Sequence, residues 1–117
     1  MTRRRLELLQ WYALLGGAVA WAAQHVAGYF VSTAACGSPA ISSSVVQIVI
    51  ASGAAVLVLA AEASAVVVFR ATRPDDPAPG GRLHFFAEAA LLGNVLFLVI
   101  VVLTGFSSVY QLPCAQS

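Results

Sequence analysis

Three long apolar runs, broken by only a few polar residues, dominate this chain of 117 residues. They cover residues 8–32, 44–69 and 83–110, and each exceeds the roughly 20 residues that a helix needs to cross a bilayer core of about 30 Å. We expect helices, because a backbone inside lipid must satisfy its own hydrogen bonds and because the runs do not alternate as barrel strands do. The pattern predicts an all-α protein with one membrane domain over 1–117 and three transmembrane helices.

The basic residues add a direction to this arrangement. All six are arginines, and they form one cluster before the first run and a second in a loop over residues 70–82: Arg3, Arg4, Arg5, Arg70, Arg73 and Arg82. Since cytoplasmic segments carry an excess of positive charge, we expect the N-terminus and this loop in the cytoplasm and the C-terminus in the periplasm. The predicted location is the bacterial inner (plasma) membrane.

Composition narrows the class of function. The chain is 60% hydrophobic and 9% charged, whereas soluble domains carry about 25% charged residues. Nucleic-acid binding and an enzyme cleft filled with water do not fit this balance. The sequence also has no nucleophile triad, phosphate-binding loop or His-Glu-x-x-His motif. We therefore expect a protein that is not an enzyme and has no cofactor or metal ion of its own.

The two cysteines, Cys36 and Cys114, both fall on the predicted periplasmic side. We expect a disulfide between them, because that compartment is oxidising. Closing so long a loop would stabilise the fold by about 4–5 kcal/mol through the entropy of the unfolded chain. The alternative interpretation is a thiolate site for Cu(I), which favours soft ligands.

Two acidic residues inside the apolar runs are candidates for function. Glu62 and Glu88 lie eight and six residues from the nearest arginine, which corresponds to about 12 Å and 9 Å along a helix. At such similar depths the two carboxyls could form a proton-binding pair. The alternative is that a glutamate hydrogen-bonds to Gln10, Asn94 or a neighbouring subunit.

The remaining polar residues of the runs favour contacts between helices. Gln24, His25 and Asn94 are expected to supply such contacts, within the chain or to a partner. His84 lies at the inner end of its run and His25 about 25 Å from the inner end of the first. One haem iron would therefore not reach both imidazoles.

Small residues recur at helical spacing along the runs, and they predict close approach of helices. Gly16, Ala20 and Gly28 follow one face of the first run, and Ala89 and Gly93 follow one face of the third. These faces would pack against the chain's own helices. Alternatively, they would dock onto a larger membrane protein.

Some of these residues together resemble a known group of proteins. They are Trp21, Gln24, Gly28 and Tyr29 in the pattern Trp-x-x-Gln-x-x-x-Gly-Tyr, the lone Cys36, the Gly-Asn-x-Leu-Phe segment from Gly93 to Phe97, and the pair Pro113-Cys114. The chain is similar here to the small membrane proteins found with bacterial haem–copper cytochrome c oxidases and their copper-assembly factors. The resemblance covers the first and third runs and both cysteines, and it implies an accessory subunit or assembly factor without a redox centre of its own.

From these observations we expect a non-catalytic accessory subunit of a bacterial respiratory membrane complex, in contact with lipids and with oxidase core subunits. Two alternatives stay open. One is a small oligomeric transporter that couples to protons through Glu62. The other is a metal or haem assembly factor that uses Cys36 and Cys114.

Overall fold

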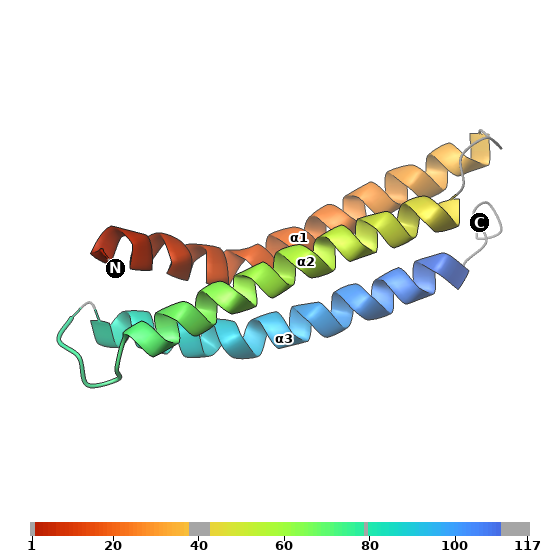
Figure 1. The fold of residues 1–117 in the computed structure, drawn as a ribbon. Coiled ribbons are helices and arrows are strands. Elements are labelled where there is room, and N and C mark those ends of the chain that lie inside the picture. The colour runs from red at the N-terminus through yellow and green to blue at the C-terminus, as the bar shows by residue number, and fades with distance from the viewer. Residues whose placement is uncertain (1, 38–42, 79, 111–117) are drawn as a thin grey trace.

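The structure, a computed structural model, describes the backbone of residues 2–37, 43–78 and 80–110 and side chains within these ranges. It is an all-helical bundle of α1 (Arg3–Gly37), α2 (Ser43–Ala71) and α3 (Gly80–Tyr110), with successive helices antiparallel (Figure 1). Each helix packs against both others, and the molecule measures 58 × 20 × 18 Å. All three helices are long and apolar enough to cross a membrane, which indicates a multi-pass membrane protein.

The helices extend beyond the apolar runs from which they were predicted. The start of α1 lies five residues before the run over 8–32, because Thr2 caps the helix by accepting a hydrogen bond from the Arg5 N–H at 3.4 Å. The expected loop over 70–82 is shorter, since α2 continues to Ala71 and α3 begins at Gly80. Hydropathy marks the part of a helix that suits lipid, whereas capping and loop contacts determine where the helix ends.

The connection between α2 and α3 explains why a pair of glycines can open a helix. The Asp76 carboxylate accepts a hydrogen bond from the Arg73 N–H at 2.8 Å, which holds the turn tightly against the start of α3. A Cβ atom at Gly80 would lie 2.7 Å from the Asp76 Cβ, and one at Gly81 would lie 3.1 Å from the Pro74 carbonyl oxygen. Glycine is therefore required here for close approach.

Small side chains fill the interior of the bundle and large apolar side chains cover its outside. The largest buried cluster consists of Ala20, Ala54, Val58 and Val101. A second cluster contains only alanines, and a third combines one alanine with a valine and a leucine. By contrast, Leu92 is 70% exposed. Such a surface would cause aggregation in water and suits lipid or another apolar partner.

The two ends of the bundle differ in charge. The arginines belong to the start of α1, the end of α2, the following turn and the start of α3. Figure 1 shows the N-terminus and the α2–α3 connection at the same end of the bundle. The clustering of positive charge that the sequence predicts along the chain is therefore also a clustering in space.

Candidate functional site

Polar side chains inside the bundle form the candidate site. Gln10, Gln24, Gln47 and Asn94 are buried although they lie in helices that are apolar enough to span a membrane. Three of these four amides donate a hydrogen bond to a backbone carbonyl of a neighbouring helix. A buried amide needs such a partner, because it would otherwise lose its hydrogen bonds to water without compensation.

Asn94 links α3 to α1. Its Nδ2 donates to the Ala13 carbonyl oxygen at 2.9 Å. Its Oδ1 faces Gly17, where an added Cβ would lie only 2.6 Å from that oxygen and 3.1 Å from the Phe97 ring. The missing side chain at Gly17 therefore provides the space in which the Asn94 amide lies.

Gln24 makes a second link between the same two helices, further from the arginine end. Its Nε2 donates to the Val101 carbonyl oxygen at 3.1 Å, and a Cβ at Gly105 would lie 3.5 Å from this nitrogen and 2.5 Å from the Ala51 Cβ. The Oε1 of Gln24 is buried without a partner among the described residues. Among the described residues, the Gln24 amide therefore has a hydrogen-bond partner for its donor nitrogen but none for its oxygen.

Gln47 links α2 to α1. Its Nε2 donates to the Gly28 carbonyl oxygen at 3.0 Å, and a Cβ at Gly28 would lie 3.1 Å from its Oε1. Each of the three amides thus lies against a glycine of another helix. Sequence reasoning identified Gly28 as a small residue for helix packing, but it did not pair it with an amide and did not select Gly105 or Gln47.

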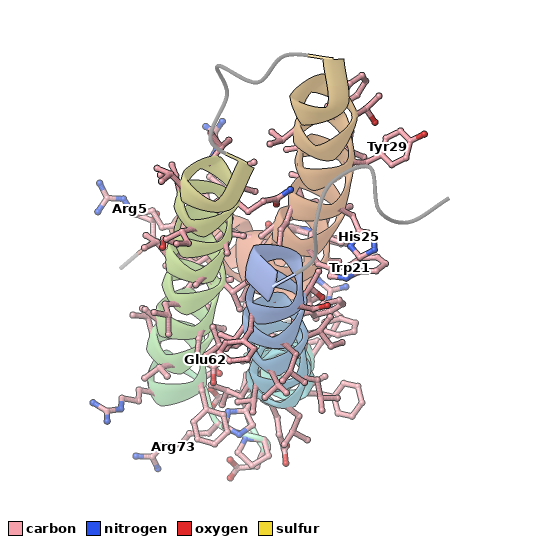
Figure 2. All side chains as sticks on the ribbon, turned by 90° about the vertical axis from the view of Figure 1, so that its right-hand side faces the viewer. Arg5, Trp21, His25, Tyr29, Glu62 and Arg73 are labelled. Atoms are coloured by element: carbon pink, nitrogen blue, oxygen red, sulfur yellow. The ribbon has the colours of Figure 1, made fainter. Side chains whose placement is uncertain are left out.

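Glu62 brings an ionisable group to the level of the Asn94 link. The Glu62 carboxyl lies beside the Asn94 side chain, and its Oε2 is buried with no partner among the described residues. Figure 2 shows Glu62 on α2, directed toward α3. Through Asn94 this carboxyl is connected to all three helices.

Glu88 lies elsewhere, and the expected depth of the two glutamates is wrong. Because Glu62 contacts Asn94, it lies six residues beyond Glu88 along α3, which is about 9 Å. The Glu88 side chain is also exposed, whereas Glu62 is partly buried. Counting residues from the arginines failed because α2 and α3 do not leave the arginine end at the same level. The two carboxyls therefore do not form a pair.

His25 lies on the outside of α1. Its side chain is exposed and lies tilted against the Trp21 ring, with 5.1 Å between the ring centroids (Figure 2). The Trp21 ring in turn lies 6.5 Å from the Phe97 ring, centroid to centroid. His25 and Gln24 are neighbours in sequence, but they do not share a hydrogen-bond partner, because Gln24 points into the bundle. An imidazole on a lipid-facing helix surface is costly unless something outside the chain contacts it.

His84 has a local structural role at the arginine end. Its Nδ1 lies 3.2 Å from the Thr72 hydroxyl and 3.1 Å from the Thr72 carbonyl oxygen, and its ring stacks on Phe69 at 4.4 Å. Gln24, next to His25, contacts Val101, which lies 17 residues beyond His84 in α3. The two histidines are thus separated by about 25 Å along the bundle, too far to bind one metal ion.

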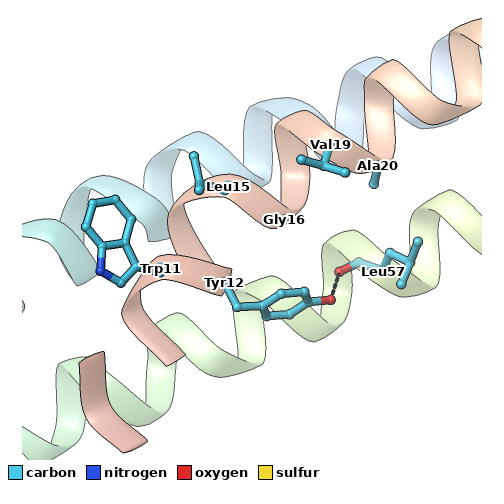
Figure 3. Close-up of a pocket in the computed structure, with 7 residues that line it drawn as sticks. All are labelled: Trp11, Tyr12, Leu15, Gly16, Val19, Ala20 and Leu57. Carbon is cyan, nitrogen blue, oxygen red and sulfur yellow. Dashed lines mark hydrogen bonds between the residues drawn. The ribbon is translucent and has the colours of Figure 1, made fainter. Parts of the chain in front are cut away.

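An apolar groove opens between α1 and α2. It has a volume of about 330 Å³ and is lined by Trp11, Tyr12, Leu15, Gly16, Val19, Ala20 and Leu57 (Figure 3). The Tyr12 hydroxyl donates to the Leu57 carbonyl oxygen at 3.0 Å, so its polar atom is used within the chain. The groove consequently presents hydrocarbon to its surroundings.

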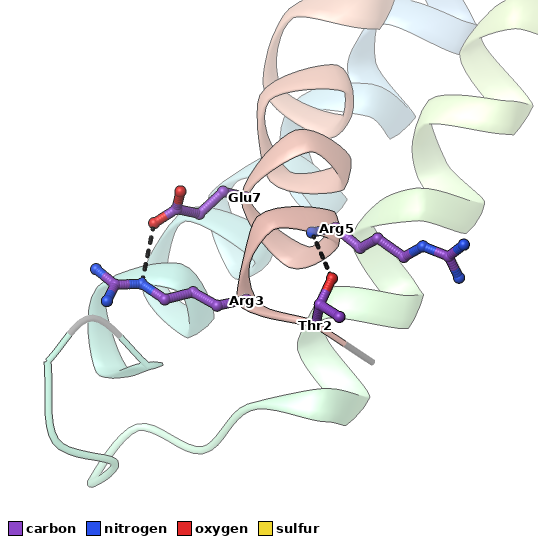
Figure 4. Close-up of polar contacts among 4 residues, drawn as sticks. All are labelled: Thr2, Arg3, Arg5 and Glu7. Carbon is purple, nitrogen blue, oxygen red and sulfur yellow. Dashed lines mark hydrogen bonds and ion pairs between the residues drawn. The ribbon is translucent and has the colours of Figure 1, made fainter.

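The predicted disulfide and one surface ion pair concern residues at the ends of the bundle. The backbone of Cys36 continues α1 instead of forming a loop, but the Cys36 side chain and the whole of Cys114 lie outside the described residues. The disulfide therefore stays a prediction. At the arginine end, Arg3 pairs with Glu7 at 3.4 Å on the outer surface of α1 (Figure 4).

Within the described part of the chain no cluster of three or more potential metal ligands occurs. Comparison of the chain with protein-family models, with curated proteins and with solved structures gave no match. The features that bear on function are neutral amides that link the helices, one carboxyl with an unpartnered oxygen, and an exposed imidazole on an apolar surface.

Proposed function

We propose that this protein is a non-catalytic accessory subunit of a larger respiratory membrane complex in the bacterial inner membrane, a haem–copper cytochrome oxidase. In this proposal its helices add to the lateral surface of the oxidase core. The amide links support it, because they use the buried polar groups to hold the chain's own helices in place. The outer surface of the helices is therefore wide and apolar, with few polar groups.

The single observation that carries the proposal is the position of His25. It is exposed on a helix that is apolar enough to span a membrane, and it packs on Trp21. In lipid an imidazole without a hydrogen-bonding partner is unfavourable. A polar group on a transmembrane helix of a partner protein would provide that hydrogen bond, and the surrounding apolar side chains would pack around it.

Co-purification from native membranes in a mild detergent tests this function. The tagged chain is expected to bring down a complex with the absorption bands of haem. His25→Leu should reduce the haem recovered per tagged chain while leaving the fold unchanged, because His25 has no buried contact to lose. Leu92→Ala on the exposed face of α3 is the matched control. A tagged chain that purifies without haem would refute the proposal.

The proposal includes an orientation, with the arginine end in the cytoplasm. A single cysteine at Asp76, in a chain whose own cysteines are replaced, should react with a maleimide that does not cross membranes only after the cells are opened. The native Cys36 and Cys114 should react in intact spheroplasts, but only after reduction if they form the predicted disulfide. Labelling of position 76 in intact spheroplasts would contradict this orientation.

A further inference from the structure

The Glu62 carboxyl has an oxygen that the fold buries and leaves unsatisfied. Oε2 has no hydrogen-bond partner among the described residues, although the carboxyl contacts Asn94. Glu62 lies within α2, nine residues before the helix ends at Ala71. A full negative charge with one oxygen held in this way would be strongly disfavoured.

No charged group from the helices around Glu62 offsets such a charge. From α1 the nearest titratable side chain is Tyr12, whose hydroxyl is already donated to Leu57. On α3 the facing residue is the neutral Asn94, with Glu88 exposed about 9 Å away. On α2 itself, Arg70 lies eight residues on, about 12 Å along the helix. In the described residues the one ion pair is Arg3–Glu7, at the surface.

Three kinds of positive partner are conceivable for this carboxyl, and the structure favours one. A metal ion needs several ligands, and no cluster of three candidates occurs in the described part of the chain. A guanidinium or ammonium group of another protein would reach only Oε1 of the partly buried carboxyl and would leave Oε2 unsatisfied, because the chain's own atoms shield Oε2 from a water-sized probe. A proton requires no additional space.

We propose that Glu62 is a proton-binding site, occupied in the membrane at neutral pH, at the level where the three helices meet around Asn94. There the Asn94 Nδ2 donates to the Ala13 carbonyl oxygen, so α3 is linked to α1 beside the Glu62 carboxyl of α2. Oε2 is then a neutral carbonyl oxygen, whose burial is far less costly than that of a charge.

Dicyclohexylcarbodiimide tests the site on the full chain in liposomes. This apolar reagent reacts with protonated carboxyls: the carboxyl oxygen bonds to the central carbon of the reagent, the proton moves to a reagent nitrogen, and an acyl shift gives a stable N-acylurea with no leaving group. We expect one adduct per chain, located on Glu62 by peptide mass spectrometry. Its rate of formation should fall as the pH is raised.

Matched variants keep the result interpretable. Glu62→Gln, which preserves shape and the contact with Asn94, should abolish the adduct, whereas Glu88→Gln should leave it unchanged. Infrared spectra give a second measurement that needs no reagent access: the C=O band of a protonated carboxyl should be present at pH 7 and lost in Glu62→Gln. Absence of that band in the unmodified protein, or equally fast labelling of Glu88, would overturn the proposal.

The inference does not depend on which complex the protein joins. Failure of haem to co-purify would remove the proposed accessory role and leave the protonated carboxyl intact. Conversely, an ionised Glu62 would leave the accessory role intact. A proton-binding carboxyl at this depth is also the component that a small proton-coupled transporter would require, and proton flux in liposomes that is lost in Glu62→Gln would favour that function.

Discussion

Two kinds of polar junction occupy the interior of the bundle. Gln24 and Gln47 each join two helices through one neutral amide that donates to a backbone carbonyl. The junction at Asn94 begins in the same way, with a bond to Ala13, but it also includes the carboxyl of Glu62. All three junctions share the bond from an amide to a backbone carbonyl, but only the Asn94 junction also contains an ionisable group.

The two kinds of junction should therefore respond differently to pH. An amide does not titrate, so the two glutamine junctions should hold the helices equally well across the physiological pH range. A carboxyl gains or loses a proton, so under the proposal that Glu62 binds a proton, the Asn94 junction is the level at which helix packing should depend on pH.

The largest effect on stability is expected from a side chain that fills the space occupied by the Asn94 amide. In Gly17→Val the added side chain would overlap the Asn94 Oδ1 and the Phe97 ring, and overpacking of this kind should lower the free energy of unfolding by about 2–3 kcal/mol. Unfolding in mixed micelles with increasing dodecyl sulfate measures the loss. The matched control is Gly93→Val, because a Cβ at Gly93 meets nothing within 4 Å. Equal losses in both variants would show that the contact with Asn94 is unimportant.

Removal of the amide itself should have the next largest effect. Asn94→Ala deletes the bond to Ala13 and leaves the Glu62 carboxyl without its partner, so we expect a loss of about 1–2 kcal/mol in the same assay. Leu92→Ala, two residues away on the exposed face, provides the comparison. The distinction between the two kinds of junction would fail if Glu62→Gln, which keeps a hydrogen-bonding side chain at that position, were as damaging as Asn94→Ala.

The glutamine junctions should be less sensitive to substitution. Gln24→Met removes the bond to Val101, but it also removes the buried Oε1 that has no partner. These effects oppose each other, so the net change in unfolding free energy should stay below about 0.6 kcal/mol. Gln47→Met should cost more, because no atom of Gln47 is left unsatisfied. Stability curves for both variants should keep their shape between pH 6 and pH 8.

The smallest effect is expected outside the interior. Arg3 and Glu7 pair on the surface with their side chains 70% and 38% exposed, and solvent screens such a pair. Arg3→Gln should therefore change the free energy of unfolding by no more than about 0.3–0.5 kcal/mol, and added salt should reduce that difference. A loss as large as that of Asn94→Ala would mean that the arginine end, and not the interior, controls stability.

Several features of the protein follow directly from local properties of the chain. The length of the apolar runs predicts three helices because the bilayer thickness sets how many residues must be apolar. The arginines predict one positive end because cytoplasmic segments carry the excess of positive charge, and two helices that cross the membrane return the chain to the side from which it started. Glu62 and Asn94 were selected as candidates because polar residues inside apolar runs are costly.

Contacts between helices required the folded structure. Helix rotation and register depend on how side chains of different helices fit together, and no single segment contains that information. Packing therefore turned Gln24 inward and His25 outward, although they are neighbours in sequence. Packing also placed Glu62 beside Asn94 instead of Glu88, and set each interior amide against a glycine. A local pattern reveals that a helix carries a polar group, but the group's partner is chosen by the other two helices.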